Sequence, residues 1–457
     1  RFATAGVWYR NSHAVFMTET RVNQSAVVTG CMPHRHGIVA NRFLAPEIDP
    51  RAAIDSGDDL QLATAFAVPD VCLIQATTLA ERLAAAGLRY ASLSAGTAGG
   101  GRLINHCAEQ NGTFRFAMRR PETSCPPGVG DRIVDRIGAI PTHTLPAKAW
   151  ITWAVSAYLD YVEVEIAPDV MLLWLCEPDE SFHQHGIGSP ASLKAIRHVD
   201  QEFGRILARH ETAISDGSMH VIAMSDHGQI GLAGPPLDLV ARLREAGFKA
   251  SKTVDGEAEL LVVQGNAAGL WSTGDDTDLI ARCVDWLRRQ DWCGPLFTRD
   301  GTAGTLAHRE LRFDHPRAPD IAVICRSNDD RNAFGCEGMS RHDAIYPEGG
   351  GNHGGLSRYE LHNLLTLGGA RFRPRTVLDV PAGNVDITPT ILALLGLPQP
   401  GDIDGRPLTE AFRTGSSAAT LTATDHIIAS TNSDGPKTYL SVTEVGRTRY
   451  INRAWVA

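Results

Sequence analysis

The feature that most constrains the fold of this chain is an alternation of short apolar runs with amphipathic helical segments. Residues 170–176 (VMLLWLC) are apolar throughout, which is typical of a strand covered on both faces. Ser189 and Pro190 then begin a segment whose apolar residues recur at helical spacing, and residues 221–224 form a second apolar run. This order of elements predicts an α/β fold with a mainly parallel central sheet.

The same pattern continues in other parts of the chain. Thr78 and Glu81 have the spacing of a capping box, which predicts a helix that ends at Gly87 and a strand directly after it. Thr388 and Pro389 begin the last clear helix of the sequence. We therefore expect helices and buried strands to alternate on both sides of the middle of the chain.

The middle of the chain interrupts this alternation. Residues 235–317 combine a helix, mixed strands and a turn-rich stretch, and the buried-strand pattern of the core is expected to resume at Ile321. We therefore expect an inserted, cap-like subdomain over residues 235–317, within a catalytic core formed by residues 1–234 and 318–457. The last stretch, residues 416–457, is polar with a few Val, Tyr and Trp, and we expect a hairpin or strand there.

The composition excludes several classes of partner. The 457 residues are 43% hydrophobic, which suits a globular protein, and no apolar run is long enough to cross a membrane. A net charge of −9 gives no basic surface for a nucleic acid duplex. Nine cysteines without a C-x-x-C pair indicate no disulfide framework, which favours a reducing compartment and so a cytoplasmic protein.

Acidic and histidine side chains follow both apolar runs at the point where each run ends. Asp179 and His183 follow the first run, and Asp226 and His227 follow the second. In open α/β sheets ligands bind beyond the carboxyl ends of the strands, so these side chains are expected to share a site. His353 lies among glycines, where the backbone can approach closely. Aspartate and histidine are the ligands that suit zinc or manganese.

A hydroxyl group stands at the start of a predicted short helix near the beginning of the chain. Thr20 precedes a helical segment that runs toward Gly30. The first N–H groups of a helix and the positive end of its dipole form a cradle for a phosphoryl group. Taken singly, such a threonine is more often a helix cap, and an aspartate or histidine after a strand more often serves a turn. The order and spacing of these residues together favour a catalytic site.

The segment from Thr20 to Asn41 (TRVNQSAVVTGCMPHRHGIVAN) resembles the nucleophile segment of the type I phosphodiesterase and nucleotide pyrophosphatase family, within the alkaline phosphatase superfamily. In that family a threonine stands ten residues before the glycine of a T-G pair, and Thr20 has this interval to Gly30. The family's later motifs follow in the same order, so the resemblance spans nearly the whole chain. The matching positions are Glu177-Pro178-Asp179 with His183, Ser225-Asp226-His227-Gly228, His353, residues 385–390 and residues 404–408.

The resemblance implies an alkaline-phosphatase-like three-layer sandwich and a metal-dependent hydrolase of a small-molecule phosphate ester or diester. It implies two divalent metal ions, zinc or else manganese. Thr20 would be the nucleophile and form a phospho-threonine intermediate, and Asn41 with the backbone N–H of Thr20 would bind a phosphate oxygen. The implied metal ligands are Asp179, His183 and His353 for one ion, and Asp226, His227 and the Thr20 oxygen for the other.

Two departures from the family pattern bear on activity. The family's second metal site also uses an aspartate upstream of the nucleophile segment, and this sequence begins too late to contain it, so we expect a longer parent chain. Phe182 stands where the family has glycine, which removes no ligand. If the aspartate is absent from the full protein, the chain is a non-catalytic binding protein with this fold. A C–P hydrolase similar to phosphonoacetate hydrolase shares the same threonine and ligands, so it stays open, as does the oligomeric state.

Overall fold

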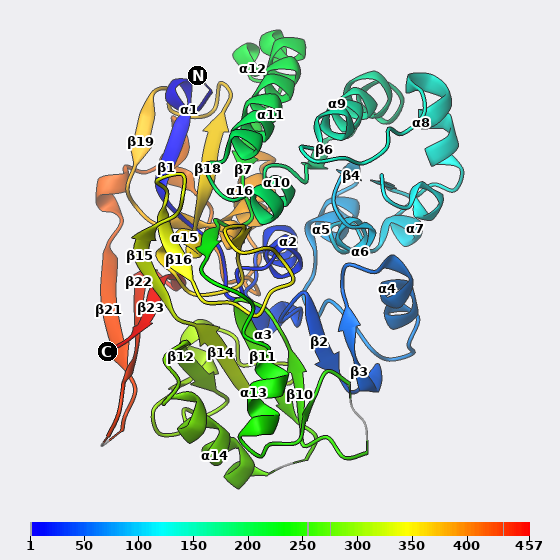
Figure 1. The fold of residues 1–457 in the computed structure, drawn as a ribbon. Coiled ribbons are helices and arrows are strands. Elements are labelled where there is room, and N and C mark those ends of the chain that lie inside the picture. Colours follow the sequence, from blue (N-terminus) through cyan, green and yellow to red (C-terminus); the bar gives the residue numbers. More distant parts are fainter. Residues whose placement is uncertain (1, 254–255, 275, 433) are drawn as a thin grey trace.

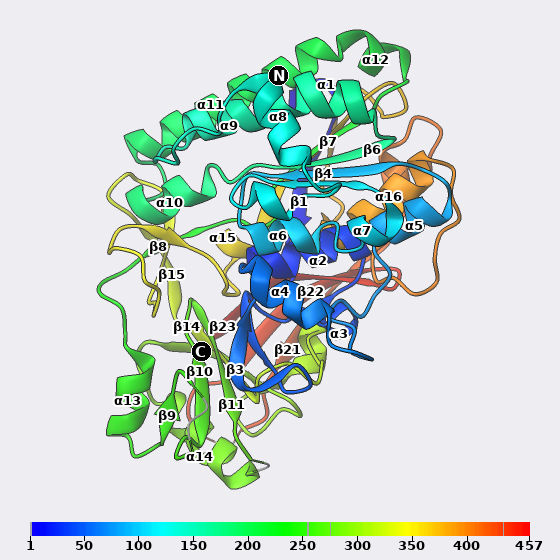
Figure 2. The same cartoon turned by 90° about the vertical axis from the view of Figure 1, so that its right-hand side faces the viewer.

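The computed structural model of the chain describes residues 2–253, 256–274, 276–432 and 434–457. Strands occupy a central layer in the upper part of the molecule, and helices lie on both of its faces (Figure 1). The view turned by 90° shows these strands edge-on between two layers of helices, with other sheets below (Figure 2). This three-layer arrangement confirms the predicted α/β class.

One part of the central layer is a mixed sheet built around the first strand of the chain. Its order is β19 (Thr376–Leu378), β1 (Val7–His13), β18 (His362–Gly368) and β7 (Val221–Met224), and β20 (Ala382–Gly383) pairs with the end of β1. β19 and β20 run parallel to β1, whereas β18 runs antiparallel to both β1 and β7. β18 is therefore the exception to the mainly parallel direction of the layer.

The other part of the central layer is a parallel sheet of β5 (Phe114–Ala117), β4 (Tyr90–Ser94) and β6 (Val170–Trp174), in that order. β4 is the strand predicted after the capping-box helix. Every residue of β4 is buried, because it has a hydrogen-bonded neighbour on each edge and helices on both faces. The predicted pattern of a fully covered strand is therefore met at β4.

The apolar runs at residues 170–176 and 221–224 form β6 and β7, and both strands are less buried than predicted. Alternate residues of β6 pack into different cores, Met171 and Leu173 into one and Leu172 and Trp174 into the other, so both faces are covered as expected. Every residue of β6 and β7 is nevertheless partly exposed. The reason is that each is the last strand of its sheet within the described part of the chain and pairs along one edge.

Local capping sequences set the ends of the helices that cover this layer. Ser189 caps α11 (Pro190–Arg209) by accepting the N–H of Ser192, and Thr78 and Glu81 form the predicted capping box of α5 (Leu79–Ala85). The other α-helices outside the expected inserted segment are α1 (Phe2–Ala5), α2 (Thr20–Thr29), α3 (Pro33–His36), α4 (Asp59–Phe66), α6 (Ala98–Leu103), α7 (Ala108–Asn111), α8 (Val129–Ile137), α9 (Lys148–Ala157), α10 (Asp179–His185), α12 (Glu211–Asp216), α15 (Arg358–Leu361) and α16 (Ile387–Leu394).

The expected inserted segment carries a sheet with its own core. The sheet has the order β13 (Leu306–Ala307), β12 (Cys293–Thr298), β14 (Ile321–Cys325), β11 (Ala267–Ser272), β10 (Leu260–Val263) and β9 (Ala250–Ser251). Helices α13 (Leu239–Glu245) and α14 (Thr277–Leu287) pack against it. The expectation that the core resumes at Ile321 is wrong, because β14 lies between β12 and β11 and completes this sheet. The limits of the subdomain at residues 235–317 stay a prediction.

Three smaller sheets complete the described structure. The predicted terminal hairpin is a three-stranded antiparallel sheet of β21 (Ala423–Ala429), β22 (Thr438–Val445) and β23 (Thr448–Val456). A hairpin of β2 (Arg42–Ala45) and β3 (Asp49–Asp55) follows α3. The last sheet has the order β15 (Ser327–Arg331), β16 (Glu337–Ser340), β8 (Ile230–Leu232) and β17 (Gly351–Asn352). No helix in the described ranges has the length and apolar character that a membrane crossing needs, and all nine cysteines are free.

Candidate active site

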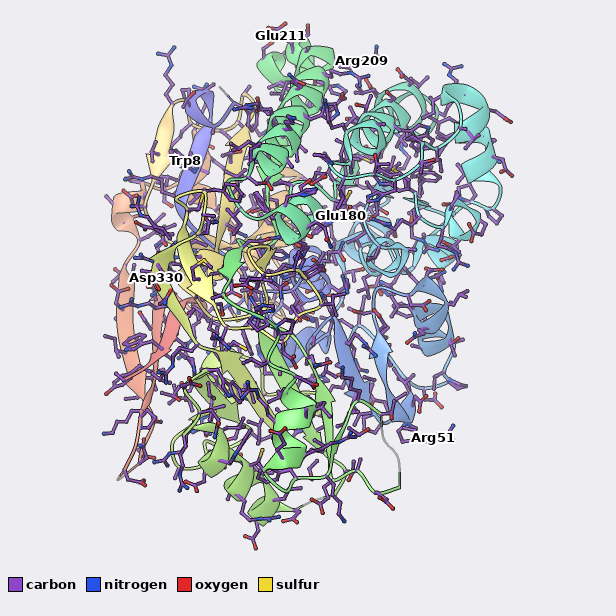
Figure 3. The ribbon with its side chains drawn as sticks, in the orientation of Figure 1. Trp8, Arg51, Glu180, Arg209, Glu211 and Asp330 are labelled. Carbon is purple, nitrogen blue, oxygen red and sulfur yellow. The ribbon has the colours of Figure 1, made fainter. Side chains whose placement is uncertain are left out.

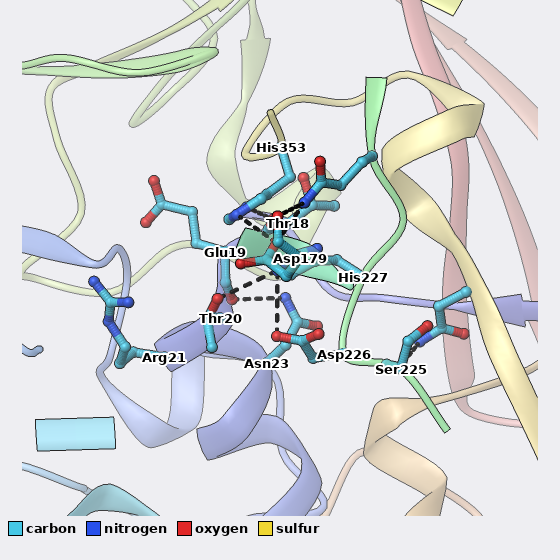
Figure 4. Close-up of polar contacts among 12 residues, drawn as sticks. Thr18, Glu19, Thr20, Arg21, Asn23, Asp179, Ser225, Asp226, His227 and His353 are labelled. Atoms are coloured by element: carbon cyan, nitrogen blue, oxygen red, sulfur yellow. Dashed lines mark hydrogen bonds and ion pairs between the residues drawn. The ribbon is translucent and has the colours of Figure 1, made fainter. Parts of the chain in front are cut away.

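The ends of the central strands and the start of α2 carry the polar residues singled out in the sequence. Asp179 is the first residue of α10, which follows β6, and Asp226 and His227 lie directly after β7. Thr20 is the first residue of α2, and His353 directly follows β17. Figure 4 shows these side chains directed toward one another from four separate segments.

A first group of ligands consists of Asp179, His183 and His353. The carboxylate of Asp179 lies 3.3 Å from His183 Nε2 and 3.6 Å from His353 Nε2. The three ligand atoms all lie within 4.8 Å of one another, a spacing that could hold a metal ion. His183 and His353 are buried, so a cation bound here would be largely shielded from water.

A second group consists of Asp226, His227 and Thr20. His227 Nε2 lies 3.2 Å from Asp226 Oδ2 and 3.3 Å from Thr20 Oγ1. The ring of His227 stacks on the ring of His353 at a centroid distance of 3.7 Å, which joins this group to the first. The threonine hydroxyl, two carboxylates and three imidazoles predicted to act together therefore form one continuous cluster.

Each histidine of the cluster is oriented by the main chain. His183 Nδ1 is 2.8 Å from the carbonyl oxygen of Gly351, and His353 Nδ1 is 2.8 Å from that of Thr18. His227 Nδ1 is 2.9 Å from the carbonyl oxygen of Gly228. In each case the ring donates its Nδ1–H to a carbonyl, which leaves the Nε2 lone pair directed into the cluster. Three such imidazoles and two carboxylates fit divalent cations of the zinc or manganese type.

Burial and neighbouring charges act in opposite directions on the two aspartates. Burial acts to raise the pKa of Asp179, but the imidazoles of His183, His353 and His227 outweigh it and hold this pKa well below its usual range. Burial also raises the pKa of Asp226, and the attraction of His227 does not offset that increase. Burial, followed by the charge of His227, lowers the pKa of His353, so this imidazole is neutral and free to bind a cation.

Asn41 lies beside the start of α2 and is held by two hydrogen bonds, each of which has a main-chain N–H group as its donor. Its Oδ1 accepts the backbone N–H of Arg21 at 3.0 Å, and its own backbone N–H donates to the carboxylate of Glu19. Because the side-chain oxygen is occupied, the amide N–H2 group is left to donate toward a ligand. Helix α2 begins at Thr20 and ends at Gly30, whose φ of 72° is the left-handed conformation that glycine adopts easily.

Two residues at the site were not identified from the sequence. Gln229 Nε2 donates to Asp179 Oδ1, and the ring of Tyr346 stacks on His183 at a centroid distance of 3.9 Å. The position of Gln229, two residues after His227, is a sequence signal that could have drawn attention to it. Tyr346 has no such signal, since its loop approaches His183 only in the folded chain.

Comparison with known proteins shows what most of this chain is similar to. A sequence model described as "Type I phosphodiesterase / nucleotide pyrophosphatase" matches residues 1–328. Ectonucleotide pyrophosphatase/phosphodiesterase family member 1 of Rattus norvegicus is 24% identical over 228 residues, which is 50% of this chain and 21% of the relative. Venom phosphodiesterase 2 of Crotalus adamanteus is 24% identical over 252 residues, 53% of this chain and 25% of the relative.

The solved structures show the same fold. Murine ectonucleotide pyrophosphatase/phosphodiesterase 5 superposes with a TM-score of 0.57 and 16% identity, and the match covers 87% of this chain and 89% of the murine chain. The matched part of this chain spans about a quarter or less of the length of the curated relatives, 21% and 25% in the two cases above. The three-layer α/β architecture is therefore shared, while what the longer relatives do as whole proteins is a separate question.

Proposed function

This chain belongs to the type I phosphodiesterase/nucleotide pyrophosphatase family, and from that membership we propose that it is a metal-dependent hydrolase of nucleotide-type phosphodiesters. The observation that carries the proposal is the position of Thr20. Its Oγ1 lies at the first turn of α2 and 3.3 Å from His227 Nε2, beside a cluster of imidazoles and carboxylates. A hydroxyl in this place can attack a phosphorus atom that the helix N-terminus holds.

Two ligand groups would hold two divalent cations. Asp179, His183 and His353 would hold one, and Asp226, His227 and the oxygen of Thr20 would hold the other. Bound cations of this kind lower the pKa of a coordinated hydroxyl and neutralise negative charge on the phosphoryl group. Zinc is the first choice for this oxygen and nitrogen donor set, and manganese the second.

The residues of the chain then have distinct tasks in the reaction. Thr20 Oγ1 attacks phosphorus while the alcohol or nucleoside phosphate leaves on the opposite side, which forms a phospho-threonine that still carries the second ester group of the substrate. The free N–H groups of the first turn of α2 and the side-chain amide of Asn41 bind the non-bridging oxygens of the phosphoryl group. A water molecule then attacks the same phosphorus, releases the remaining monoester, such as a nucleoside monophosphate, and restores the hydroxyl of Thr20.

The substrate class follows from the relatives. The murine relative was also solved, as an inactive variant, in complex with AMP. That complex supports a nucleoside monophosphate as one of the groups that this kind of site accepts. We therefore place nucleotide diesters and pyrophosphates ahead of simple monoesters, and ahead of phosphonates, as substrates of this chain.

A substrate panel tests the proposal. With zinc or manganese supplied, the protein is expected to hydrolyse the p-nitrophenyl ester of thymidine 5′-monophosphate and bis-p-nitrophenyl phosphate faster than p-nitrophenyl phosphate. Phosphonoacetate serves as the third arm. Equal or faster cleavage of the monoester would replace the proposal with a phosphatase, and preferential cleavage of phosphonoacetate would replace it with a C–P hydrolase.

Substitution of Thr20 tests its role as the nucleophile, with Thr20→Ala as the test variant and Thr20→Ser as the matched control. Thr20→Ala is expected to lower turnover of the diesters by about 10³-fold or more, because no other group takes the place of a lost nucleophile. Thr20→Ser keeps a hydroxyl and is expected to retain part of the activity. Circular dichroism should be unchanged in both variants, and Thr20→Ala should keep at least the cation held by Asp179, His183 and His353. Full activity in Thr20→Ala would remove Thr20 from the mechanism.

A further inference from the structure

A second cluster of metal-ligating side chains lies on the other flank of α10. It consists of His143, Cys176 and Glu180, whose ligand atoms all lie within 4.8 Å of one another. Successive helical residues point in directions roughly 100° apart, so Glu180 lies on a different side of α10 from the preceding Asp179. Figure 3 labels Glu180 on the side of α10 toward the cyan segment that contains α8 and α9. The mechanism proposed above uses none of the three side chains.

The three residues come from three separate segments of the chain. His143 lies in the connection between α8 and α9, Cys176 follows β6, and Glu180 is the second residue of α10. Glu177 holds these segments together, since its carboxylate accepts the backbone N–H of Ala147 at 2.7 Å and the hydroxyl of Ser181 at 2.8 Å. The cluster is therefore positioned by contacts that do not use its own ligand atoms.

We propose that His143, Cys176 and Glu180 bind a thiophilic divalent cation such as Zn²⁺, separate from the ions of the active site, with Cys176 as a thiolate ligand. A sulfur, a nitrogen and an oxygen donor form a ligand set that zinc accepts, with a water as the fourth ligand. The thiol proton of Cys176 leaves when the cation binds, and the N–H proton of His143 moves from Nε2 to Nδ1 so that the Nε2 lone pair faces the cation. The bound cation would tie the α8–α9 connection and the end of β6 to the helix that carries Asp179 and His183.

The ligand atoms of the cluster lie within 4.8 Å of one another, which can be compared with the spacing in a zinc site. Zinc bonds of about 2.0–2.3 Å place neighbouring ligands of a tetrahedral site roughly 3.3–3.7 Å apart. His143 Nε2 and Glu180 Oε2 are 2.6 Å apart, the separation of a hydrogen-bonded pair, so these side chains need to open by about 1 Å to admit a cation. Cys176 is buried, whereas His143 and Glu180 are partly exposed, which gives a cation a path from solvent.

Arg119 is the group that competes with a cation at this place. Its guanidinium lies 2.5 Å from Glu180 Oε1 and 3.3 Å from His143 Nε2. The side chain of Arg119 is 34% exposed, so it can move into solvent when a cation enters. Arg119→Gln removes this competing charge and is expected to tighten cation binding, whereas a cluster that is only an ion-pair network would lose its organisation in that variant.

Cobalt titration of the whole, metal-stripped chain tests the proposal. A thiolate bound to Co²⁺ gives a near-ultraviolet sulfur-to-cobalt charge-transfer band, and the active-site ligands contain no sulfur. We expect a band whose final intensity corresponds to one cobalt–thiolate bond per chain, which disappears in Cys176→Ser and persists in Asp179→Asn. His143→Ala is expected to weaken the titration by about tenfold or more.

Other outcomes would overturn the assignment. Absence of the band in the unsubstituted chain would do so, and so would a band that survives in Cys176→Ser, since it would come from another thiol such as Cys72, which is exposed. Glu180→Gln keeps the thiol and replaces a partly exposed side chain, so it is the second variant if Cys176→Ser does not fold; an unchanged titration in Glu180→Gln would also contradict the site. None of these readouts depends on whether the chain hydrolyses phosphodiesters.

Discussion

The two ligand groups of the active site differ in how completely the protein holds them. Asp179 has two imidazoles within ion-pair distance and accepts a hydrogen bond from Gln229, and its pKa is held low. Asp226 has one imidazole at that distance among the described residues, and burial raises its pKa. The first group therefore combines two imidazoles with a carboxylate whose charged form its neighbours stabilise, whereas the second has one imidazole and a carboxyl group whose charged form burial disfavours.

This difference indicates a division of tasks between the groups. A cation at the first group would be bound tightly and remain in place through the reaction cycle. A cation at the second group would be bound more weakly and would lie against Thr20, where the chemistry takes place. The comparison thus leads to different expectations for two chemically identical substitutions.

The largest expected effect comes from the matched pair Asp179→Asn and Asp226→Asn. Asp179→Asn is expected to lower the affinity for the tightest cation by about 100-fold or more, and diesterase activity with it. Asp226→Asn is expected to lose activity while it keeps that tight cation. Calorimetric titration of the metal-free variants with Zn²⁺ distinguishes them. Loss of the tight cation in Asp226→Asn, or its retention in Asp179→Asn, would reverse the comparison.

The pKa values of the buried structural histidines His13 and His308 and that of the ligand histidine His183 are shifted in opposite directions, and the pH dependence of stability depends on this direction. Burial lowers the pKa of both His13 and His308 from 6.5 to about 4, whereas Asp179 raises the pKa of His183 against the effect of burial. The folded protein binds a proton at His13 or His308 more weakly than the unfolded chain does. The contribution of these two histidines to the free energy of unfolding is therefore fully present above pH 6.5 and is lost as the pH falls toward 4. The loss at pH 5 is about 2 kcal/mol for each of them.

Urea unfolding at pH 7 and pH 5 measures this loss. The unfolding midpoint of the unsubstituted chain is expected to fall at the lower pH. His308→Gln lacks the titrating group, so its midpoint should fall by less, whatever its stability at pH 7. A fall of the same size in the variant would mean that His308 does not contribute to acid destabilisation.

The smallest expected effect concerns the residue that supports Asp179. Gln229→Ala removes the side-chain N–H that donates to Asp179 Oδ1, and it is expected to weaken the tight cation by about tenfold. Gln229→Glu keeps the size of the side chain but places a like charge against Asp179. Affinity that is unchanged in Gln229→Ala would show that the imidazoles alone position the carboxylate.

Features set by neighbouring residues in the sequence were predicted, and features set by distant pairing were not. The caps at Ser189 and Thr78 act within one turn, so the starts of α11 and α5 could be predicted. The strand at Ile321–Cys325 was recognised as buried but was assigned to the core, because hydrophobicity does not reveal which sheet a strand joins. The part-exposed edges of β6 and β7 depend on sheet order, which the apolar runs do not contain.

The same distinction applies to the site. The ligand residues could be named because their motifs keep a fixed order and spacing along the chain. Gln229 and Tyr346 reach Asp179 and His183 from separate loops, and their contacts exist only after folding. The catalytic roles stay predictions that the experiments above can test. The limits of the inserted subdomain and the cytoplasmic compartment also stay predictions.

The three carbonyl oxygens that receive the Nδ1–H groups have a consequence for sequence divergence. They belong to the peptide backbone of Thr18, Gly351 and Gly228, so replacing a nearby side chain does not delete them. Mutations around the cluster can therefore accumulate without switching the tautomer of any imidazole, provided that the path of the chain is kept. Such mutational robustness lets the donor set persist while the surrounding surface is free to adapt to new ligands.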